Sequence, residues 1–202
     1  MPRFNQSFPS GQRPLVSLGG SADSGLAVGP GQLFGPRGLC LLGEQGPLFV
    51  ADTGHHRVLA WSDLPSAGVD ADLCLGQVDF VSEARNGGGE VSASSMNAPV
   101  SVVPYRQGIA VADSWNHRVL LWPDHVPTSG QPATQVLGQT ELSSGQSNRG
   151  RTAPDAGSMF WPCGLYADEE LFCVADAGNR RVLIWRGSRS PVGCDPDLIL
   201  GQ

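Results

Sequence analysis

Two histidines at matching places in a repeated motif are the side chains best suited to metal chemistry. His56 and His117 each precede an Arg-Val-Leu stretch, and they are 61 residues apart. Imidazole nitrogens are common ligands of zinc and other transition metals. If copies of both rings gathered on one face of the protein, they would form a metal site. The structural alternative is that each ring packs or forms a hydrogen bond at its own turn, and Arg180 at the third copy of the position favours it.

A second set of side chains is suited to contacting a ligand or a protein partner. Trp115 stands at a predicted turn where the other copies of the motif have Gly54 and Gly178, and aromatic residues are enriched in interfaces. Further candidates lie in the Gly- and Ser-rich linker 140–159, because long loops often carry binding residues. The candidate contact residues are Trp115, His55, Asn148, Arg149 and Arg151.

Local signatures of catalysis and of disulfide bonding are missing from the sequence. It contains neither a Gly-x-Ser-x-Gly nucleophile elbow nor a phosphate-binding G-x-x-x-x-G-K-[ST] loop. There are five cysteines, without C-x-x-C spacing. An odd number of cysteines and the absence of a secretory signal predict free, mostly buried thiols in a reducing compartment, and we therefore expect a cytoplasmic protein.

The candidate residues belong to a stretch that the chain repeats three times, at 48–61, 109–122 and 172–185. Each copy has an apolar run ending in Val-Ala-Asp, a four-residue turn, and a second run that reads Arg-Val-Leu-x-Trp. Two apolar runs joined by a tight turn predict a β-hairpin. The Asp and the Arg then lie opposite each other, so we expect a structural Asp–Arg pair in every copy. These residues are Asp52 and Arg57, Asp113 and Arg118, and Asp176 and Arg181.

Other landmarks keep the same period, which identifies a true repeat. Pro36, Pro99 and Pro162 are 63 residues apart, and Gly76, Gly138 and Gly201 are separated by 62 and 63 residues. Each unit contains four predicted antiparallel strands, the pattern of β-propeller blades. We therefore predict an all-β protein with blades at about 32–77, 97–139 and 160–202, an extra strand at 15–20, and a flexible tail at 1–14.

The motif Val-Ala-Asp-x-x-Asn-His-Arg-Val-Leu-x-Trp resembles the NHL repeat. The middle copy keeps Asn116, His117 and Arg118, whereas the first has His55 in the Asn place and the third has Arg180 in the His place. The resemblance covers about residues 30–202. It implies a β-propeller, commonly of six blades, so the three blades of this chain would be half of a ring.

Half a ring needs a partner, because blades one and three would each expose a flat apolar face, and such patches mark interfaces. Two copies about a two-fold axis along the central channel would make six blades and bury these faces. We therefore expect a homodimer. The rival hypotheses are that the chain is a piece of a longer propeller, or that a different protein completes the ring.

The most consistent function is non-catalytic binding, in which the face that carries the linkers and hairpin turns contacts a protein or a small ligand. The resemblance also implies an alternative, a metal-dependent lyase or lactonase-like enzyme with zinc or calcium held by His56 and His117 in the central channel. A net charge of −6, with 13 Arg and no Lys against 19 acidic residues, disfavours nucleic acid as a partner. No apolar stretch is long enough to predict a membrane span.

Overall fold

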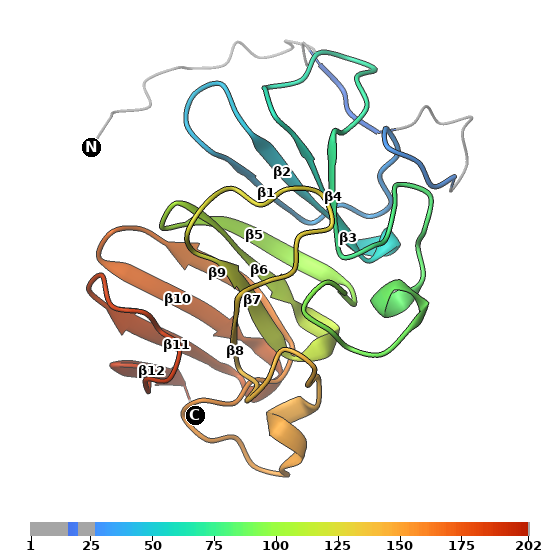
Figure 1. The fold of residues 1–202 in the computed structure, drawn as a ribbon. Helices are drawn as coiled ribbons and strands as arrows, with labels where there is room; N and C mark the ends of the chain where they lie inside the picture. Colours follow the sequence, from blue (N-terminus) through green and yellow to red (C-terminus); the bar gives the residue numbers. More distant parts are fainter. Residues whose placement is uncertain (1–15, 20–26, 202) are drawn as a thin grey trace, which may run out of the picture.

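The computed structural model describes residues 16–19 and 27–201, which form three four-stranded antiparallel sheets lying side by side (Figure 1). Blade one contains β1 (Gly38–Leu41), β2 (Leu48–Asp52), β3 (Arg57–Trp61) and β4 (Leu73–Leu75). Blade two contains β5 (Pro99–Tyr105), β6 (Gly108–Asp113), β7 (Arg118–Trp122) and β8 (Gln135–Leu137). Blade three contains β9 (Pro162–Ala167), β10 (Leu171–Asp176), β11 (Arg181–Arg186) and β12 (Leu198–Gly201). The predicted all-β class and the three four-stranded blades are confirmed.

Within every sheet the strands follow their order in the chain, so each blade is a simple meander. The central hairpins turn through short 3-10 segments, namely η2 (Thr53–His55), η4 (Ser114–Asn116) and η6 (Ala177–Asn179). The next residue, His56, His117 or Arg180, has a φ of 55° or 56°. This left-handed residue reverses the chain, and its backbone amide donates to the carbonyl of the first turn residue. The two linkers contain η3 (Arg85–Gly88) and η5 (Ser147–Gly150).

Two apolar cores lie between neighbouring blades. Between blades one and two, Phe49 and Val58 from one sheet meet Val111 and Leu120 from the next. Between blades two and three, Val119 and Leu121 meet Leu183. At the end of each linker a fully buried methionine, Met96 or Met159, joins the corresponding core. The central strands β6 and β7 of blade two are therefore buried on both faces, as their continuous apolar runs predict.

The outer flanks of the two end blades differ, and the expectation that both expose a flat apolar face is wrong for blade one. Its outward residues Val50, Leu59 and Trp61 are buried. Leu18 and Leu33 from the preceding segment pack against them. The flank is covered because the segment that precedes blade one in the chain packs on it.

The flank of blade three is open by comparison. Burial alternates along β10 and β11, where Cys173, Val182 and Ile184 are only half-buried. The outermost strand β12 is exposed throughout, and Leu200 keeps 49% of its surface. Here the expectation of an exposed apolar flank is confirmed.

The extra strand expected at 15–20 is not formed by the residues of that stretch that the structure describes, since Val16–Gly19 has no strand geometry. A strand needs a ladder partner, and no ladder between described residues includes this segment. Leu15 and Gly20 lie outside the described residues, as do the tail 1–14 and Gln202, which was expected to end blade three.

The described cysteines are all free thiols, of which Cys40 and Cys74 are buried, Cys173 is half-buried, and Cys163 and Cys194 are exposed. Burial raises the pKa of Cys40 to about 12 and that of Cys74 to about 11. The prediction of buried thiols thus holds for two of the five.

The described part of the chain also has no helix of the length and apolarity needed to cross a membrane.

Candidate functional site

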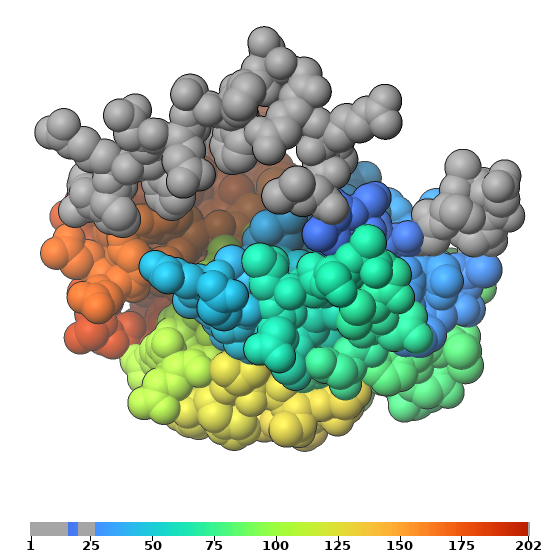
Figure 2. Space-filling model, turned by 90° about the horizontal axis from the view of Figure 1, so that it is seen from above, coloured from blue at the N-terminus to red at the C-terminus, as the bar shows by residue number. Residues whose placement is uncertain are grey.

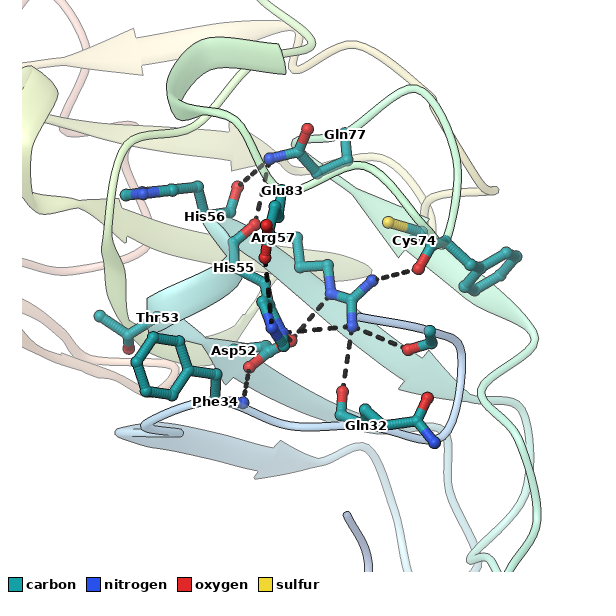
Figure 3. A network of polar contacts seen from close by, with 12 residues as sticks. Gln32, Phe34, Asp52, Thr53, His55, His56, Arg57, Cys74, Gln77 and Glu83 are labelled. Atoms are coloured by element: carbon teal, nitrogen blue, oxygen red, sulfur yellow. Dashed lines mark hydrogen bonds and ion pairs between the residues drawn. The ribbon is translucent and has the colours of Figure 1, made fainter. Parts of the chain in front are cut away.

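The Asp–Arg pair of each hairpin is buried and holds the neighbouring segments in place, and Figure 3 shows the pair of blade one, Asp52 and Arg57. In blade one, Arg57 Nε donates to Asp52 Oδ2 at 2.8 Å, and the backbone amide of Phe34 donates to Asp52 Oδ1 at 2.6 Å. The Arg57 guanidinium also donates to the carbonyls of Gln32 and Phe80. One buried pair therefore fastens the segment before the blade and the linker after it to the same hairpin turn.

The other two blades repeat this arrangement, so the predicted pairs are confirmed. The Nε–Oδ2 distance is 2.7 Å for Arg118 and Asp113 and 2.8 Å for Arg181 and Asp176. Burial raises the pKa of Asp113, while the charge of Arg118 lowers it. Because removing charge from water opposes the attraction within such a pair, the pairs contribute more to geometry than to stability.

His56 and His117 connect neighbouring blades. The backbone amide of Ala98 donates to His56 Nδ1 at 2.9 Å, and that of Trp161 donates to His117 Nδ1 at 3.1 Å. Burial is the largest cause that lowers the pKa of both rings, which favours the neutral form that this hydrogen bond requires. Neither ring belongs to a group of three or more His, Cys, Asp and Glu side chains suited to a metal ion among the described residues. These hydrogen bonds are those that the structural alternative expects, and a metal site built from the histidines of two copies stays a prediction.

Two of the residues predicted to contact a partner are internal to the fold. His55 is 1% exposed, and its Nδ1 lies 2.8 Å from Asp52 Oδ2. Asn148 is 5% exposed and exchanges hydrogen bonds with Asn179, which in turn donates to Asp176. Both side chains are buried and form hydrogen bonds inside the fold, so they are not available to contact a partner.

The two predicted contact arginines lie in linker 140–159, and neither lines the surface hollow that Trp115 lines. Arg149 donates to the carbonyls of Gly138 and Gly157 at 3.3 and 2.5 Å, which ties it to the end of blade two and to its own linker. Arg151 is exposed and its Nη1 lies 2.5 Å from Asp155 Oδ2. The structure therefore separates these arginines from Trp115, and their role in binding stays a prediction.

Trp115, in the turn between β6 and β7, and Trp161, directly before β9, form an exposed aromatic pair. Their rings are 6.1 Å apart and inclined by 34°, and 55% and 44% of the two residues is exposed. They line a hollow of about 570 Å³ to which all three blades contribute. Its other lining residues include Arg37, Thr53, Cys163 and Ala177, and none of the lining residues is acidic.

The neighbouring residues explain why only the second hairpin carries a tryptophan. A Cβ atom on Gly54 would lie 2.2 Å from the ring of Phe34, and one on Gly178 would lie 2.5 Å from the ring of Phe160. Blade two has Asn97 at the place of these phenylalanines. The space that a phenylalanine fills in the other blades is thus free for a larger residue at position 115.

Sequence reasoning missed Trp161 as the partner of Trp115. Trp161 stands where the other blades have Gly35 and Ala98, and all three have a positive φ, of 54°, 59° and 51°. A large side chain in this conformation is unusual and often marks a functional constraint. The available signal was the alignment of the three repeats, which puts a tryptophan at a position otherwise held by Gly and Ala.

Residues 35–61, which span β1, β2 and β3 of blade one, match the NHL repeat. No curated protein matches the chain. Blades two and three repeat both the motif and the hydrogen-bonded hairpin of the matched segment. The chain thus carries an NHL repeat, and its three sheets are blades of the β-propeller kind.

Proposed function

We propose that this protein is a non-catalytic binding protein, a scaffold whose linker-and-hairpin face contacts a protein partner. The observation that carries the proposal is the exposed pair of Trp115 and Trp161 over a hollow shared by three blades. Exposing two large rings to water is unfavourable for a protein that has no use for them. Tryptophan and arginine are also the residue types that most often dominate the energy of protein interfaces.

The charges around the hollow indicate the chemistry of the partner. Arg37 lines it, and no carboxylate does, although the chain as a whole carries a net charge of −6. The surface thus combines apolar rings with one cation on an otherwise acidic protein. It suits a peptide segment that presents an apolar or aromatic side chain next to an acidic one.

The test is a peptide array of acidic–aromatic sequences probed with the wild-type protein and with variants. We expect Trp115→Ala and Trp161→Ala each to weaken binding of the selected peptides by about tenfold or more, as for the loss of a central aromatic contact. Arg37→Gln should weaken binding less and reduce its dependence on salt.

Tyr166→Ala is the matched control, because Tyr166 is an exposed aromatic residue on β9 that does not line the hollow. The proposal would be contradicted if both tryptophan variants bound the peptides as strongly as the wild type. It would also be contradicted if the Tyr166 variant bound them as weakly as the tryptophan variants. Circular dichroism of each variant should match that of the wild type, since all four side chains are exposed.

A further inference from the structure

The two junctions between blades share a fixed contact at their outer edge. Gly76 and Gly138 directly follow the fourth strands of blades one and two and have φ values of 92° and 93°. A Cβ atom on Gly76 would lie 2.9 Å from Met96 Cγ, and one on Gly138 would lie 2.9 Å from Met159 Sδ. The glycine that follows each fourth strand therefore rests on the methionine that the linker delivers to the next blade.

The outer flank of blade one has an equivalent contact site on Leu33, here called the seat, and the segment Val16–Gly19 fills it. Leu33 precedes Met96 by 63 residues and so stands at the methionine position. Gly19 has a φ of 99°, and a Cβ atom on it would lie 3.6 Å from Leu33 Cβ. Leu18 packs into the cluster of this flank, as Leu75 does at the first junction. Figure 2 shows the blue segment of residues 16–19 beside the first blade.

Leu18–Gly19 thus occupies the place where the end of a preceding fourth strand would lie, although it forms no strand. The same Leu-Gly ending recurs as Leu200–Gly201 at the open edge of blade three, where Gly201 has a φ of 95°. The three atoms nearest to a Cβ on Gly201 all belong to Arg180 and Arg181 of its own blade. Gly201 therefore has the conformation of Gly76 and Gly138 without a linker residue among its nearest contacts.

We propose that the flank of blade three docks on blade one of a second copy of this chain, and that Leu200–Gly201 of one copy replaces Leu18–Gly19 of the other on Leu33. The segment Val16–Gly19 is then an internal cap, which must leave its seat before the second copy binds. Two such contacts about a two-fold axis would close a ring of two chains. This inference does not depend on the aromatic hollow or on its ligand.

The apolar residues of the two flanks support a second copy as the occupant. Cys173, Val182 and Ile184 of blade three stand at the positions of Phe49, Val58 and Ala60 in blade one, which are fully buried against blade two. The surface that receives Phe49 and its neighbours includes Val111, Leu120 and Trp122 of blade two. Blade one repeats this receiving surface as Val50, Leu59 and Trp61. The chain therefore carries both halves of a junction that it already makes twice.

The polar contact of the proposed junction differs from that of the two existing ones. His56 Nδ1 and His117 Nδ1 each accept a backbone amide of the next blade. At the proposed junction Arg180 stands at the histidine position and Gly35 at the amide position. A guanidinium has no acceptor atom, so it cannot replace the imidazole in this bond. The junction between copies should consequently be weaker than the internal ones, as an exchange of cap for partner requires.

Releasing the cap is the first test. A β-branched residue does not tolerate the φ of Gly19, so Gly19→Val should free the seat on Leu33. By sedimentation velocity we expect the dimer dissociation constant to fall by about tenfold or more, because the apparent affinity rises with the fraction of chains whose seat is free. Adding Ile184→Asp on the docking flank should restore the 21.2 kDa monomer. Gly43→Val, at another glycine of positive φ in the β1–β2 turn, is the matched control.

A crosslink tests the geometry even if the cap variant is poorly folded. At the first junction Ser129 Oγ lies 3.0 Å from the backbone nitrogen of Cys74, and the corresponding residues of the proposed junction are Ala67 and Ile199. With the exposed Cys163 and Cys194 changed to Ser, Ala67→Cys plus Ile199→Cys should give a disulfide-linked dimer on a non-reducing gel, and neither single variant should. Absence of this dimer, or an unchanged monomer mass for Gly19→Val, would overturn the proposal.

Discussion

Blades two and three have nearly the same hairpin motif but different surroundings. All residues of β6 and β7 are buried, whereas burial alternates residue by residue along β10 and β11. The sequence of the third hairpin is no less apolar than that of the second. Burial on both faces is thus a consequence of having two neighbours. The open flank of blade three has the apolar composition of a covered one, as the proposed docking of a second copy requires.

The largest expected difference between these blades concerns the buried arginines. Arg118 donates to Asp113 and also to the carbonyls of Ser92, Ser95 and Leu142. Arg118→Met leaves the Asp113 carboxylate buried without its partner, which should lower the free energy of unfolding by about 3–5 kcal/mol. Arg181→Met should cost less, since Arg181 is 7% exposed against 0% for Arg118, so water can enter the space that the Arg181 side chain leaves.

Urea denaturation of both variants measures this difference. The comparison between blades would fail if Arg181→Met were at least as destabilising as Arg118→Met. Arg106→Met serves as the control, because Arg106 is exposed and surface cations contribute little.

A smaller difference is expected for the apolar residues that face the next blade. Leu121 in blade two and Ile184 in blade three stand at equivalent positions, but Leu121 is fully buried against blade three and Ile184 is half-buried. Leu121→Ala should destabilise by about 2–5 kcal/mol through loss of contacts and a residual cavity. Ile184→Ala should lower the free energy of unfolding by less than half as much in the monomer.

Protein concentration sharpens this second comparison. If a second copy covers the flank of blade three, the effect of Ile184→Ala on unfolding should grow as the concentration of the protein is raised. The effect of Leu121→Ala should not change with concentration. An effect of Ile184→Ala that is already as large as that of Leu121→Ala in dilute monomer would contradict an open flank.

The smallest effect concerns pH and distinguishes the histidine junction of blade two from the Arg180 position of blade three. Burial lowers the pKa of His117 below its ordinary value of 6.5, so the neutral ring is favoured in the folded state. Its contribution to stability is present above pH 6.5 and is lost as the pH falls through the lowered pKa. Protonation of Nδ1 removes the acceptor for the Trp161 amide, a loss of about 1 kcal/mol.

Thermal unfolding recorded between neutral and mildly acidic pH measures this contribution. His117→Gln offers an oxygen acceptor that does not titrate, and it should flatten the pH dependence. His125→Gln is the control, because His125 is exposed and bonded only to Gln131 in the described hydrogen bonds. Equal pH dependence in the wild type and in the His117 variant would exclude this role.

Regular features of the fold were predictable because each depends on residues close together in sequence. The Val-Ala-Asp and Arg-Val-Leu-x-Trp runs, repeated with a constant period, predicted the hairpins and the Asp52–Arg57 type of pair. The aromatic pair was predictable only in part. Trp115 was singled out because it stands in place of a glycine, and its role in binding stays a prediction. Trp161 was missed because its contact with Trp115 joins different blades.

Burial of individual polar side chains was the least predictable property. His55 and Asn148 have the residue types of a contact surface, yet hydrogen bonds to Asp52 and to Asn179 fix them inside the fold. The sequence suggests that a turn or linker is exposed, but it does not show which of its side chains points inward. Arg151, one position past its turn, remains exposed.

The sequence alone determined the repeat, the strands, the hairpin pairs and the all-β class, because strand and turn preferences act over a few residues and recur with the period. Only the tertiary structure decided which surfaces are available. It placed Leu18 and Gly19 on the flank of blade one, left Leu200 exposed on blade three, and brought Trp115 beside Trp161. These contacts join residues far apart in the chain, where packing and not local preference fixes the outcome.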